Sequence, residues 1–573
     1  MTPAAGLAPA VGHGPILFRW NFVPHTWFDA LQIGIWFALL VALVPFSRRV
    51  LGVLQSPALR RRALLLAGLA LLARLVVPLL PFNWYSGLSN VDLGGVIWTK
   101  QTTYMPFPNQ LITFTLGFYG ILTFNIAIGV VSAVLAWHVT RRAGYGETVA
   151  AFVGIGLAIT PMYVRLSSSD STHVLPLPLF LLAAVAIQRV VERSATAADY
   201  AVLFCAPALA CPIRIEAGLV MPSVIFLVCH DRERLRAAWA ARRGFVPFAA
   251  GLSVGTLGSL LALSSSWTYR LNGGRFNPIG IIILAGLRAV FVSSVWIFPF
   301  VPMVFVFLAW FYIYSQAKRR DWGELCATVG PYAIFSIPFA YTGKAIAVEL
   351  PSHAYSYTID VFLIIAAAKG AALLLERVRS GAFLQTPARR WAAGVIGTAV
   401  IVISLWIPYQ MKWAYMEEFR FLTQSIPKGK VRIATIWDPT SPGGDFDCCL
   451  ALPYPTFIAD FPEAEWLVLT QADAENEALL RDLQFDYYYR GSLVGVDIEN
   501  INSRMFGMLP VDPEMNARQQ APLRTMRRID EIIRRTYSLV PVRSQVVEGG
   551  SLGFADFPND RVELVLYERR DPR

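Results

Sequence analysis

Long apolar runs recur through the first 411 residues of the chain and alternate with short polar connections. Ten of these runs come close to the ~20 residues that a helix needs to cross the ~30 Å hydrocarbon core of a bilayer. They are 27–46, 63–80, 111–139, 148–166, 174–191, 244–263, 295–314, 325–341, 357–375 and 391–409. The pattern therefore predicts a polytopic α-helical membrane protein.

Arginine and lysine are concentrated in every second connection between these runs. The basic positions are Arg48 and Arg49, Arg60 to Arg62, Arg141 and Arg142, Arg189 and Arg193, Arg232 to Arg243, Lys318 to Arg320, and Arg377 to Arg390. The opposite connections carry Lys100, Arg270, Arg275 and Lys344. Because short positively charged loops remain in the cytoplasm, we expect the first set of connections there and the second set at the outer face.

Residues 200–229 do not fit this alternation as one span. The segment is apolar except for PIRIE at its centre, and a single crossing would place the arginines of 232–243 outside. Two half-helices of ~13 residues, each ~20 Å long, would instead rise from the cytoplasm and return. We therefore expect a broken re-entrant pair besides about ten full spans. Its tip carries Arg214 and Glu216, which either form a structural ion pair or accompany a cavity or a charged ligand.

After residue 409 the pattern changes to that of a soluble α/β domain. Strand-like runs at 431–437, 465–470, 485–491, 537–547 and 562–570 alternate with helical stretches at 472–483 and 523–536. We therefore divide the chain into a transmembrane domain, 1–411, and a soluble α/β domain, 412–573. The expected number of crossings places the second domain and the N-terminus on the extracytoplasmic side.

Composition and charge agree with this division. The chain of 573 residues is 55% hydrophobic and 16% charged, with a mean hydropathy of +0.49. Residues 1–411 hold 31 Lys/Arg against 14 Asp/Glu, whereas 412–573 hold 19 against 25, so the basic excess belongs to the membrane part. Cytoplasmic turns explain that excess better than nucleic-acid binding, because no patch interleaves basic and aromatic residues. The six cysteines follow neither a zinc nor a disulfide pattern.

The first long outer connection, 81–110, has Asp92 as its only acid. Asparagine, tryptophan and tyrosine residues of the same loop suit contact with a sugar. A lone carboxylate at the mouth of two spans is a candidate general base at the boundary between lipid and water. An ordinary solvated loop charge is the alternative.

Two further outer connections also combine an acid with basic side chains. The turn 165–173 contains Arg165, Asp170 and His173, and the loop 343–357 contains Lys344, Glu349 and His353. Three outer loops of this kind form a plausible convergent site, although each charge taken alone is more often solvated.

With these features in place, the chain resembles the GT-C superfamily of glycosyltransferases that use polyprenyl-phosphate sugars. The resemblance covers the layout of the full chain. It rests on the acidic first outer loop, an outer turn of the form R-x-S-S-S-D before a proline-rich span, an R-x-E-A tip in the broken pair, the late outer loop with its proline, and a C-terminal outer α/β domain ending LVLYERR. The chain departs from the family in having 27–46 as an added first span and in lacking an Arg-Tyr pair in the late loop.

The resemblance implies a role for each candidate residue. Asp92 would deprotonate the acceptor hydroxyl, and Arg165, Arg214 and Lys344 would hold the lipid phosphate that leaves. The supporting residues would be Asp170, His173, Glu216, Glu349 and His353. The resemblance implies no organic cofactor. Oligosaccharyltransferase-like members use a divalent ion such as Mg²⁺ or Mn²⁺, which Asp170 would hold here, and many relatives use none.

The implied partners are a polyprenyl-phosphate-linked sugar donor, a glycan, lipid or protein acceptor, and membrane lipids, in the inner membrane of a bacterium. Two other function classes stay open at this point. A lipid or solute transporter would also contain a broken helix pair, but a second, symmetry-related pair is missing from the sequence pattern. A membrane-bound hydrolase or acyltransferase would use a histidine, for which His173 and His353 are available.

Overall fold

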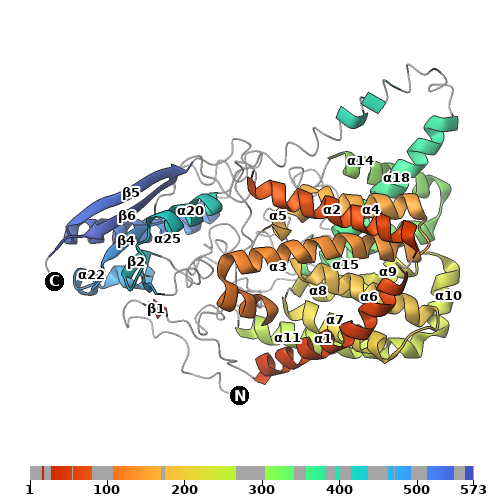
Figure 1. Cartoon of the computed structure of the whole chain (residues 1–573), viewed down its shortest axis with the longest axis horizontal. Helices are drawn as coiled ribbons and strands as arrows, with labels where there is room; N and C mark the ends of the chain where they lie inside the picture. Colours follow the sequence, from red (N-terminus) through yellow and green to blue (C-terminus); the bar gives the residue numbers. More distant parts are fainter. Residues whose placement is uncertain are drawn as a thin grey trace.

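The computed structural model describes most of the chain, with gaps at several connections. The described residues are 16–18, 27–53, 56–79, 107–168, 174–213, 215–265, 303–340, 357–380, 414–436, 463–469, 471–491, 513–547 and 562–571, together with single positions at 386, 391, 394–395, 397–399 and 494. A bundle of helices forms one part of the molecule, and a mixed β-sheet with its own helices forms the other (Figure 1).

The helices of the bundle follow the apolar runs of the sequence. They are α1 (Trp27–Val53), α2 (Pro57–Leu79), α3 (Phe107–Arg142), α4 (Glu147–Ile159), α5 (Pro161–Ser167), α6 (Pro176–Val191), α7 (Ala197–Ile213), α8 (Ile215–Val220), α9 (Val224–Val228), α10 (Arg232–Ala240), α11 (Val246–Ser265), α14 (Met303–Arg319), α15 (Trp322–Ala340) and α18 (Asp360–Ser380). The predicted run 148–166 is therefore two helices rather than one, because Pro161 has no N–H with which to continue α4. Of the run 391–409, only positions 391, 394–395 and 397–399 are among the described residues.

Two described helical segments are long and apolar enough by themselves to cross a membrane, Ala30–Gly52 and Gly120–Arg142. Shorter apolar helices occur at Glu147–Ile159, Pro176–Val191 and Ala197–Ile213. The expected set of about ten full spans is thus not confirmed over the described part of the chain.

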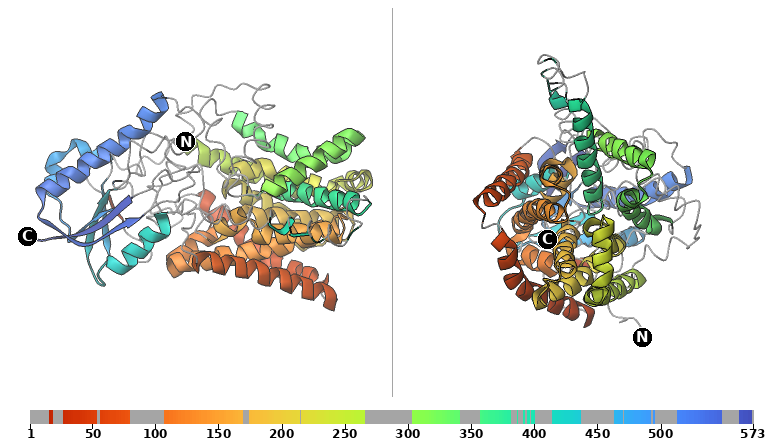
Figure 2. Two further views of the ribbon diagram at one scale, coloured as in Figure 1. Left: turned by 90° about the horizontal axis from the view of Figure 1, so that it is seen from above. Right: turned by 90° about the vertical axis from the view of Figure 1, so that its right-hand side faces the viewer.

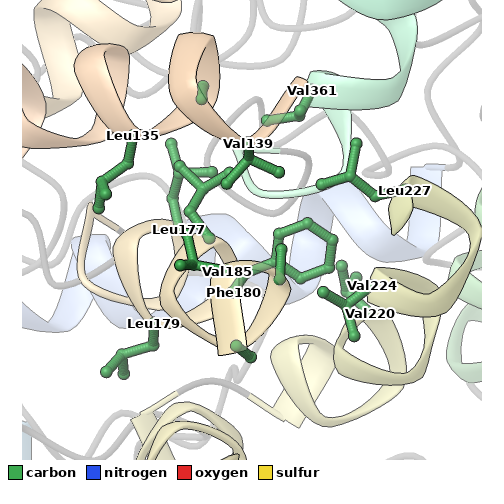
Figure 3. Close-up of a cluster of buried hydrophobic side chains, with 14 of the residues drawn as sticks. Leu135, Val139, Leu177, Leu179, Phe180, Val185, Val220, Val224, Leu227 and Val361 are labelled. Carbon is green, nitrogen blue, oxygen red and sulfur yellow. The ribbon is translucent and has the colours of Figure 1, made fainter. Parts of the chain in front are cut away.

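The core of the bundle lies around α6, whose residues are almost all buried. Figure 3 shows Phe180 and Val185 of α6 between Val139 of α3, Leu227 of α9 and Val361 of α18. Such burial on every side explains why the α6 sequence is apolar all round instead of having one polar face.

Small residues allow two of these helices to approach closely. An ideal Cβ placed on Gly251 of α11 would lie 2.0 Å from the carbonyl oxygen of Phe204 in α7, and one on Gly255 would lie 2.5 Å from that of Pro207. The two backbones therefore touch along a G-x-x-x-G stretch, as is common between helices that pack inside a bilayer.

The predicted hairpin at 200–229 is present as an arrangement of helices. Helix α7 ends at Ile213, and α8, the 3₁₀ turn Met221–Ser223 and α9 carry the chain back toward the end at which α7 began. An ideal Cβ on Gly218 would lie 3.3 Å from Sγ of Cys211, so the two arms pack side by side.

Ion pairs join several of the connections that the sequence predicts to be cytoplasmic. Within the described residues these pairs are Arg49 with Asp199 (2.6 Å), Arg62 with Glu147 (2.7 Å), and Arg142 with Glu192. Their positions bring the arginine-rich connections to one end of the bundle, which we call the basic end. The β-sheet lies beyond the opposite end, which we call the sheet end (Figures 1 and 2).

The sheet has the strand order β1-β3-β2-β4-β6-β5. Its strands are β1 (Ile16–Phe18), β2 (Arg432–Ile436), β3 (Glu465–Leu469), β4 (Tyr487–Arg490), β5 (Leu539–Val547) and β6 (Val562–Arg569). Strand β2 pairs in parallel with β3 and β4, whereas the three remaining pairings are antiparallel. The five strands predicted after residue 409 are therefore all present.

Other elements of this part were not predicted in the same form. The helical stretch 472–483 is a 3₁₀ turn, Gln471–Glu475, followed by the short α22 (Glu477–Arg481), and α25 (Pro513–Thr536) begins ten residues before its expected start at 523. Helix α20 (Ala414–Ser425) was not expected. Strand β1 comes from the N-terminal region and pairs antiparallel with β3, so both ends of the chain contribute to one sheet.

The long helix α3 links the two parts of the molecule. Its 36 residues span about 54 Å, which is more than a bilayer requires. Ile121, Leu122 and Ile126 of α3 belong to the same buried apolar cluster as Phe421 and Trp466 of the sheet region. The sheet is thus packed onto the end of the bundle from which α3 starts.

Candidate functional site

The three loops that the sequence analysis expects at the outer face are attached to helix ends that the structure describes. The first loop follows α2, the second follows α5, and the third leads into α18 through the turn at Tyr357. These helix ends all lie toward the sheet end of the bundle (Figures 1 and 2). Buried polar side chains join them in one cluster.

Arg74 of α2 is the centre of this cluster, with a side chain that is only 1% exposed. Its Nε donates to Oγ of Ser167 in α5 (2.7 Å), and its Nη1 donates to the carbonyl oxygen of Ala70 (2.9 Å). In the other direction, Ser168 donates from its hydroxyl to the backbone oxygen of Arg74 (3.2 Å). Because both side chain and backbone of Arg74 take part, α2 and α5 are tied together at the roots of the first two loops.

The break between α4 and α5 explains why a guanidinium lies here. Pro161 cannot donate to the carbonyl of Leu157, which would be its partner in a continuous helix. Arg74 Nη2 donates to that oxygen (3.3 Å), and Nη1 donates to the oxygen of Ala158 (3.2 Å). The cation thus satisfies carbonyls that the proline leaves free, at a helix C-terminus where positive charge is favourable.

Gly129 of α3 makes room for this contact. An ideal Cβ at Gly129 would lie 2.4 Å from Nε of Arg74 and 2.6 Å from both Cβ and Oγ of Ser167. Only a residue without a side chain allows α3 to pass so near the pair. Four helices, α2, α3, α4 and α5, therefore meet at Arg74.

The third loop reaches the same cluster through aromatic contact. The rings of Tyr163 in α5 and Tyr357 meet edge to face, with their centroids 4.8 Å apart, and both side chains are buried. Thr358 and Asp360, one and three residues after Tyr357, are also buried. We call Arg74, Tyr163, Ser167 and Tyr357 the anchor cluster, because it joins the roots of all three candidate loops.

Most of the predicted site residues lie outside the described part of the chain. These are Asp92, Asp170, His173, Arg214, Lys344, Glu349 and His353. Arg165 lies in α5 and Glu216 in α8, and only their backbones are described. Arg165 is two residues before Ser167, so its backbone belongs to the same short helix as the anchor cluster.

The anchor arginine was missed by the reading of the sequence. Arg74 interrupts the apolar run 63–80, and an ionisable residue within a membrane-length run is itself a signal of a buried polar network. Lys369 in the run 357–375 carries the same signal and was missed too. What the sequence could not show is the partner of either residue, because those partners come from distant helices.

Lys369 belongs to a second buried network, at the basic end. Its ammonium group donates to Oε2 of Glu324, and that oxygen also accepts from the hydroxyl of Tyr312 (2.6 Å). The ammonium nitrogen of Lys369 lies 4.6 Å from the ring centroid of Tyr145. His230 stacks on Tyr145 with the ring centroids 4.0 Å apart. These contacts link α14, α15 and α18 with the connections around α4 and α10, so we interpret the network as one that fixes the basic end.

Among the residues whose placement is described, no three His, Cys, Asp or Glu side chains gather in a way that could hold a metal ion. Asp170, which the resemblance implies as a metal ligand, lies outside those residues. The chemistry of the described cluster is hydrogen bonding by one buried cation and several hydroxyl groups, which suits the positioning of loops.

No family model matches the sequence, and no curated protein matches it. The structure is similar to a crystal structure of the Archaeoglobus fulgidus oligosaccharyltransferase in complex with Zn and sulfate, with 11% sequence identity, a TM-score of 0.43, and coverage of 89% of this chain and 75% of that chain. It is also similar to that enzyme tethered by a disulfide bond to an acceptor peptide containing the NVT sequon, with 11% identity, a TM-score of 0.38, and coverage of 89% and 76%. A likeness at this level assigns no substrate, metal or residue role to the chain.

Proposed function

We propose that the chain is an integral membrane glycosyltransferase of the GT-C type, which moves a sugar from a polyprenyl-phosphate carrier to an acceptor hydroxyl at the outer face of the membrane. The observation that carries the proposal is the anchor cluster. Three loops that carry the candidate site residues are distant in the chain, yet their roots are packed together through Arg74, Ser167, Tyr163 and Tyr357. A shared root is what a site built from those three loops requires.

The surface of the bundle supports its placement in a bilayer. Large apolar side chains of α1 and α2 are exposed, among them Phe37, Val41, Leu64, Leu65 and Leu72. In water such an extended apolar surface would be unfavourable, whereas hydrocarbon tails would cover it. In the orientation that the arginines predict, the basic end is cytoplasmic, and the anchor cluster and the sheet lie toward the outer face.

In the proposed reaction, the carboxylate of Asp92 removes the proton of the acceptor hydroxyl as its oxygen attacks the anomeric carbon of the donor sugar. The bond from that carbon to the phosphate oxygen breaks, and the electron pair leaves with the lipid phosphate. Arg165, Arg214 and Lys344 supply positive charge to this leaving group, which gains charge in the transition state.

The supporting residues have more local tasks in the proposal. Glu216 would orient the guanidinium of Arg214, since both belong to the predicted tip of the helix hairpin. Asp170 is the residue that would hold a divalent ion, which would supply further positive charge at the phosphate. His173, Glu349 and His353 line the second and third loops.

The test is glycosyl transfer from a polyprenyl-phosphate sugar by purified full-length protein. Asp92→Asn keeps the size of the side chain and should lower turnover about 10²- to 10⁴-fold, the usual contribution of a general base. Donor binding should survive, because the phosphate contacts are made by other residues. Asp29→Asn, at an acid of the first turn of α1, is the matched control and should transfer sugar at the normal rate.

Asp170→Asn and Glu349→Gln are measured alongside. Near-normal turnover in Asp92→Asn together with loss in one of these two would assign the base to that other loop. Absence of transfer by the wild-type protein with any polyprenyl-phosphate sugar, together with hydrolysis of the lipid ester, would replace the proposal with a hydrolase.

A further inference from the structure

Helix α10 lies at the basic end of the bundle, far from the anchor cluster and the three candidate loops (Figure 1). It is a separate nine-residue helix, RERLRAAWA, between the return of the hairpin at α9 and the start of α11. The side chain of Asp231 caps its N-terminus by accepting from the backbone N–H of Arg234 (2.8 Å). Nothing in the proposed transfer reaction uses this helix.

One side of α10 is fixed against the bundle. Ala238 is buried, and Nη2 of Arg234 donates to the carbonyl oxygen of Arg142 at the end of α3 (2.9 Å). The left-handed backbone of Gly144 (φ 88°) lets the turn after α3 pass beneath the same guanidinium, which lies 3.2 Å from an ideal Cβ there. These contacts set which residues of α10 face outward.

The outward side of α10 presents large apolar side chains that are exposed. Leu235 is 55% exposed and Trp239, one helical turn later, is 73% exposed. Val246 at the start of α11 and Trp322 at the start of α15 are exposed at the same end of the bundle. Exposed tryptophans at one end of a helix bundle are typical of the boundary between hydrocarbon and headgroups.

Beside this apolar pair the outward side is basic. Arg232 and Arg236 are exposed and one helical turn apart, and Arg242 and Arg243 follow the helix. The guanidinium of Arg242 lies 5.6 Å from the ring centroid of Trp239. An apolar stripe next to exposed arginines is the pattern of a helix that rests on a lipid surface with negative charge.

We propose that α10 is an interfacial helix that binds anionic phospholipid headgroups at the basic end of the protein. Leu235 and Trp239 enter the boundary of the acyl chains, while Arg232 and Arg236 hold lipid phosphates, for which the forked guanidinium is suited. The proposal goes beyond glycosyl transfer and does not depend on the catalytic roles given above. It does place the basic end in the leaflet that carries anionic lipid.

The experiment measures lipid binding by the full-length protein in a non-ionic detergent. The protein is titrated with dioleoyl-phosphatidylglycerol or, as the neutral probe, dioleoyl-phosphatidylcholine, and bound lipids are counted by native mass spectrometry. The variant Arg232→Gln/Arg236→Gln should weaken binding of phosphatidylglycerol on the order of tenfold, since each arginine near an anionic surface contributes a several-fold factor. Binding of phosphatidylcholine should change little.

The matched control is Arg60→Gln/Arg61→Gln, which removes the same charge from exposed positions at the start of α2. It should weaken binding of phosphatidylglycerol by no more than about twofold. A third variant, Leu235→Gln/Trp239→Gln, tests the apolar half and should weaken binding of both lipids. All substituted positions are exposed, and an unchanged melting temperature confirms that each variant is folded.

Three results would overturn the proposal. Equal losses in the two arginine variants would mean that the lipids respond only to the net charge of the basic end. Equal affinity of the wild-type protein for phosphatidylglycerol and phosphatidylcholine would mean that the protein does not select anionic headgroups. Normal lipid binding by the arginine variant, with loss of a co-purifying acidic protein, would make the outward face of α10 a protein-docking surface.

Discussion

The substitution Gly129→Ala tests whether the anchor cluster holds the three candidate loops in place. The new Cβ would lie 2.4 Å from Nε of Arg74 and 2.6 Å from Oγ of Ser167, distances at which one side chain must move. Arg74 has little freedom to move, because its guanidinium is buried and is held by oxygens of α2, α4 and α5. The methyl group should therefore break the hydrogen bond between Arg74 and Ser167.

The expected cost follows from these contacts. Overpacking of a tight helix contact costs about 1–3 kcal/mol, and loss of a hydrogen bond to a charged group costs about 1.5–3 kcal/mol. The overpacking cost and the cost of the lost hydrogen bond overlap in part, because a single movement of one side chain both relieves the clash and breaks the hydrogen bond between Arg74 and Ser167. We expect the free energy of unfolding of Gly129→Ala to fall by about 2–4 kcal/mol.

The assay is reversible unfolding in mixed micelles of a non-ionic and an anionic detergent, with sugar transfer measured on the same preparations. Gly68→Ala in α2 is the matched control, because an ideal Cβ there has no neighbour within 4 Å. That control should leave stability unchanged or raise it by up to about 1 kcal/mol, as alanine is the better helix former. Sugar transfer should fall only in Gly129→Ala, because the loop roots move.

A double-mutant cycle with Arg74→Met identifies the contact responsible. Methionine lacks the Nε atom, so Gly129→Ala should cost less in that background than in the wild type. If the two substitutions add within about 0.5 kcal/mol, or if Gly129→Ala behaves like Gly68→Ala, the reasoning about the anchor cluster is wrong.

Two further predictions concern the basic end and the sheet. Lys369→Met should lower the free energy of unfolding by about 3–5 kcal/mol, because Glu324 would lose its cation in a half-buried site. In the same detergent assay, Lys369→Met/Glu324→Gln should recover part of that loss. If the effects of the two substitutions simply add, the prediction is wrong. Above pH ~10 the sheet region should lose stability, because burial and the neighbouring charge of Asp530 raise the pKa of Tyr488 well above its ordinary value. The folded state keeps the phenol proton of Tyr488 at a pH where the unfolded state releases it. The contribution of Tyr488 to the free energy of unfolding is therefore complete below pH ~10 and is lost as the pH rises. Tyr488→Phe should flatten this part of the profile in denaturant titrations at several pH values, and an unchanged alkaline slope would refute the assignment.

The local pattern of the sequence was enough for several elements because each depends on residues that are close together in the chain. Short strand-like runs located the strands around Ala434, Val468 and Leu566, and apolar length located the bundle helices. The division of the segment 200–229 into α7 and a returning arm could be predicted, because a single span would have moved a cluster of arginines across the membrane at a large cost. Strand β1 could not be predicted in this way, since its partner β3 lies more than 400 residues away and supplies the hydrogen bonds that make it a strand.

Some features of the candidate site could likewise be predicted from the sequence, whereas others depend on contacts between distant residues. The sequence by itself determined which connections carry acids together with bases, because charge and hydropathy identify a polar loop between apolar runs. Only the tertiary structure decided that the roots of those loops meet, since the meeting depends on Arg74, Ser167 and Tyr357, which are far apart in the sequence. It also decided the role of Arg74, whose positive charge would be costly in an apolar run until Pro161 frees the carbonyls of α4 that the guanidinium then binds. Burial of a charge depends on the partners around it, and those partners are brought together by packing and not by neighbours in sequence.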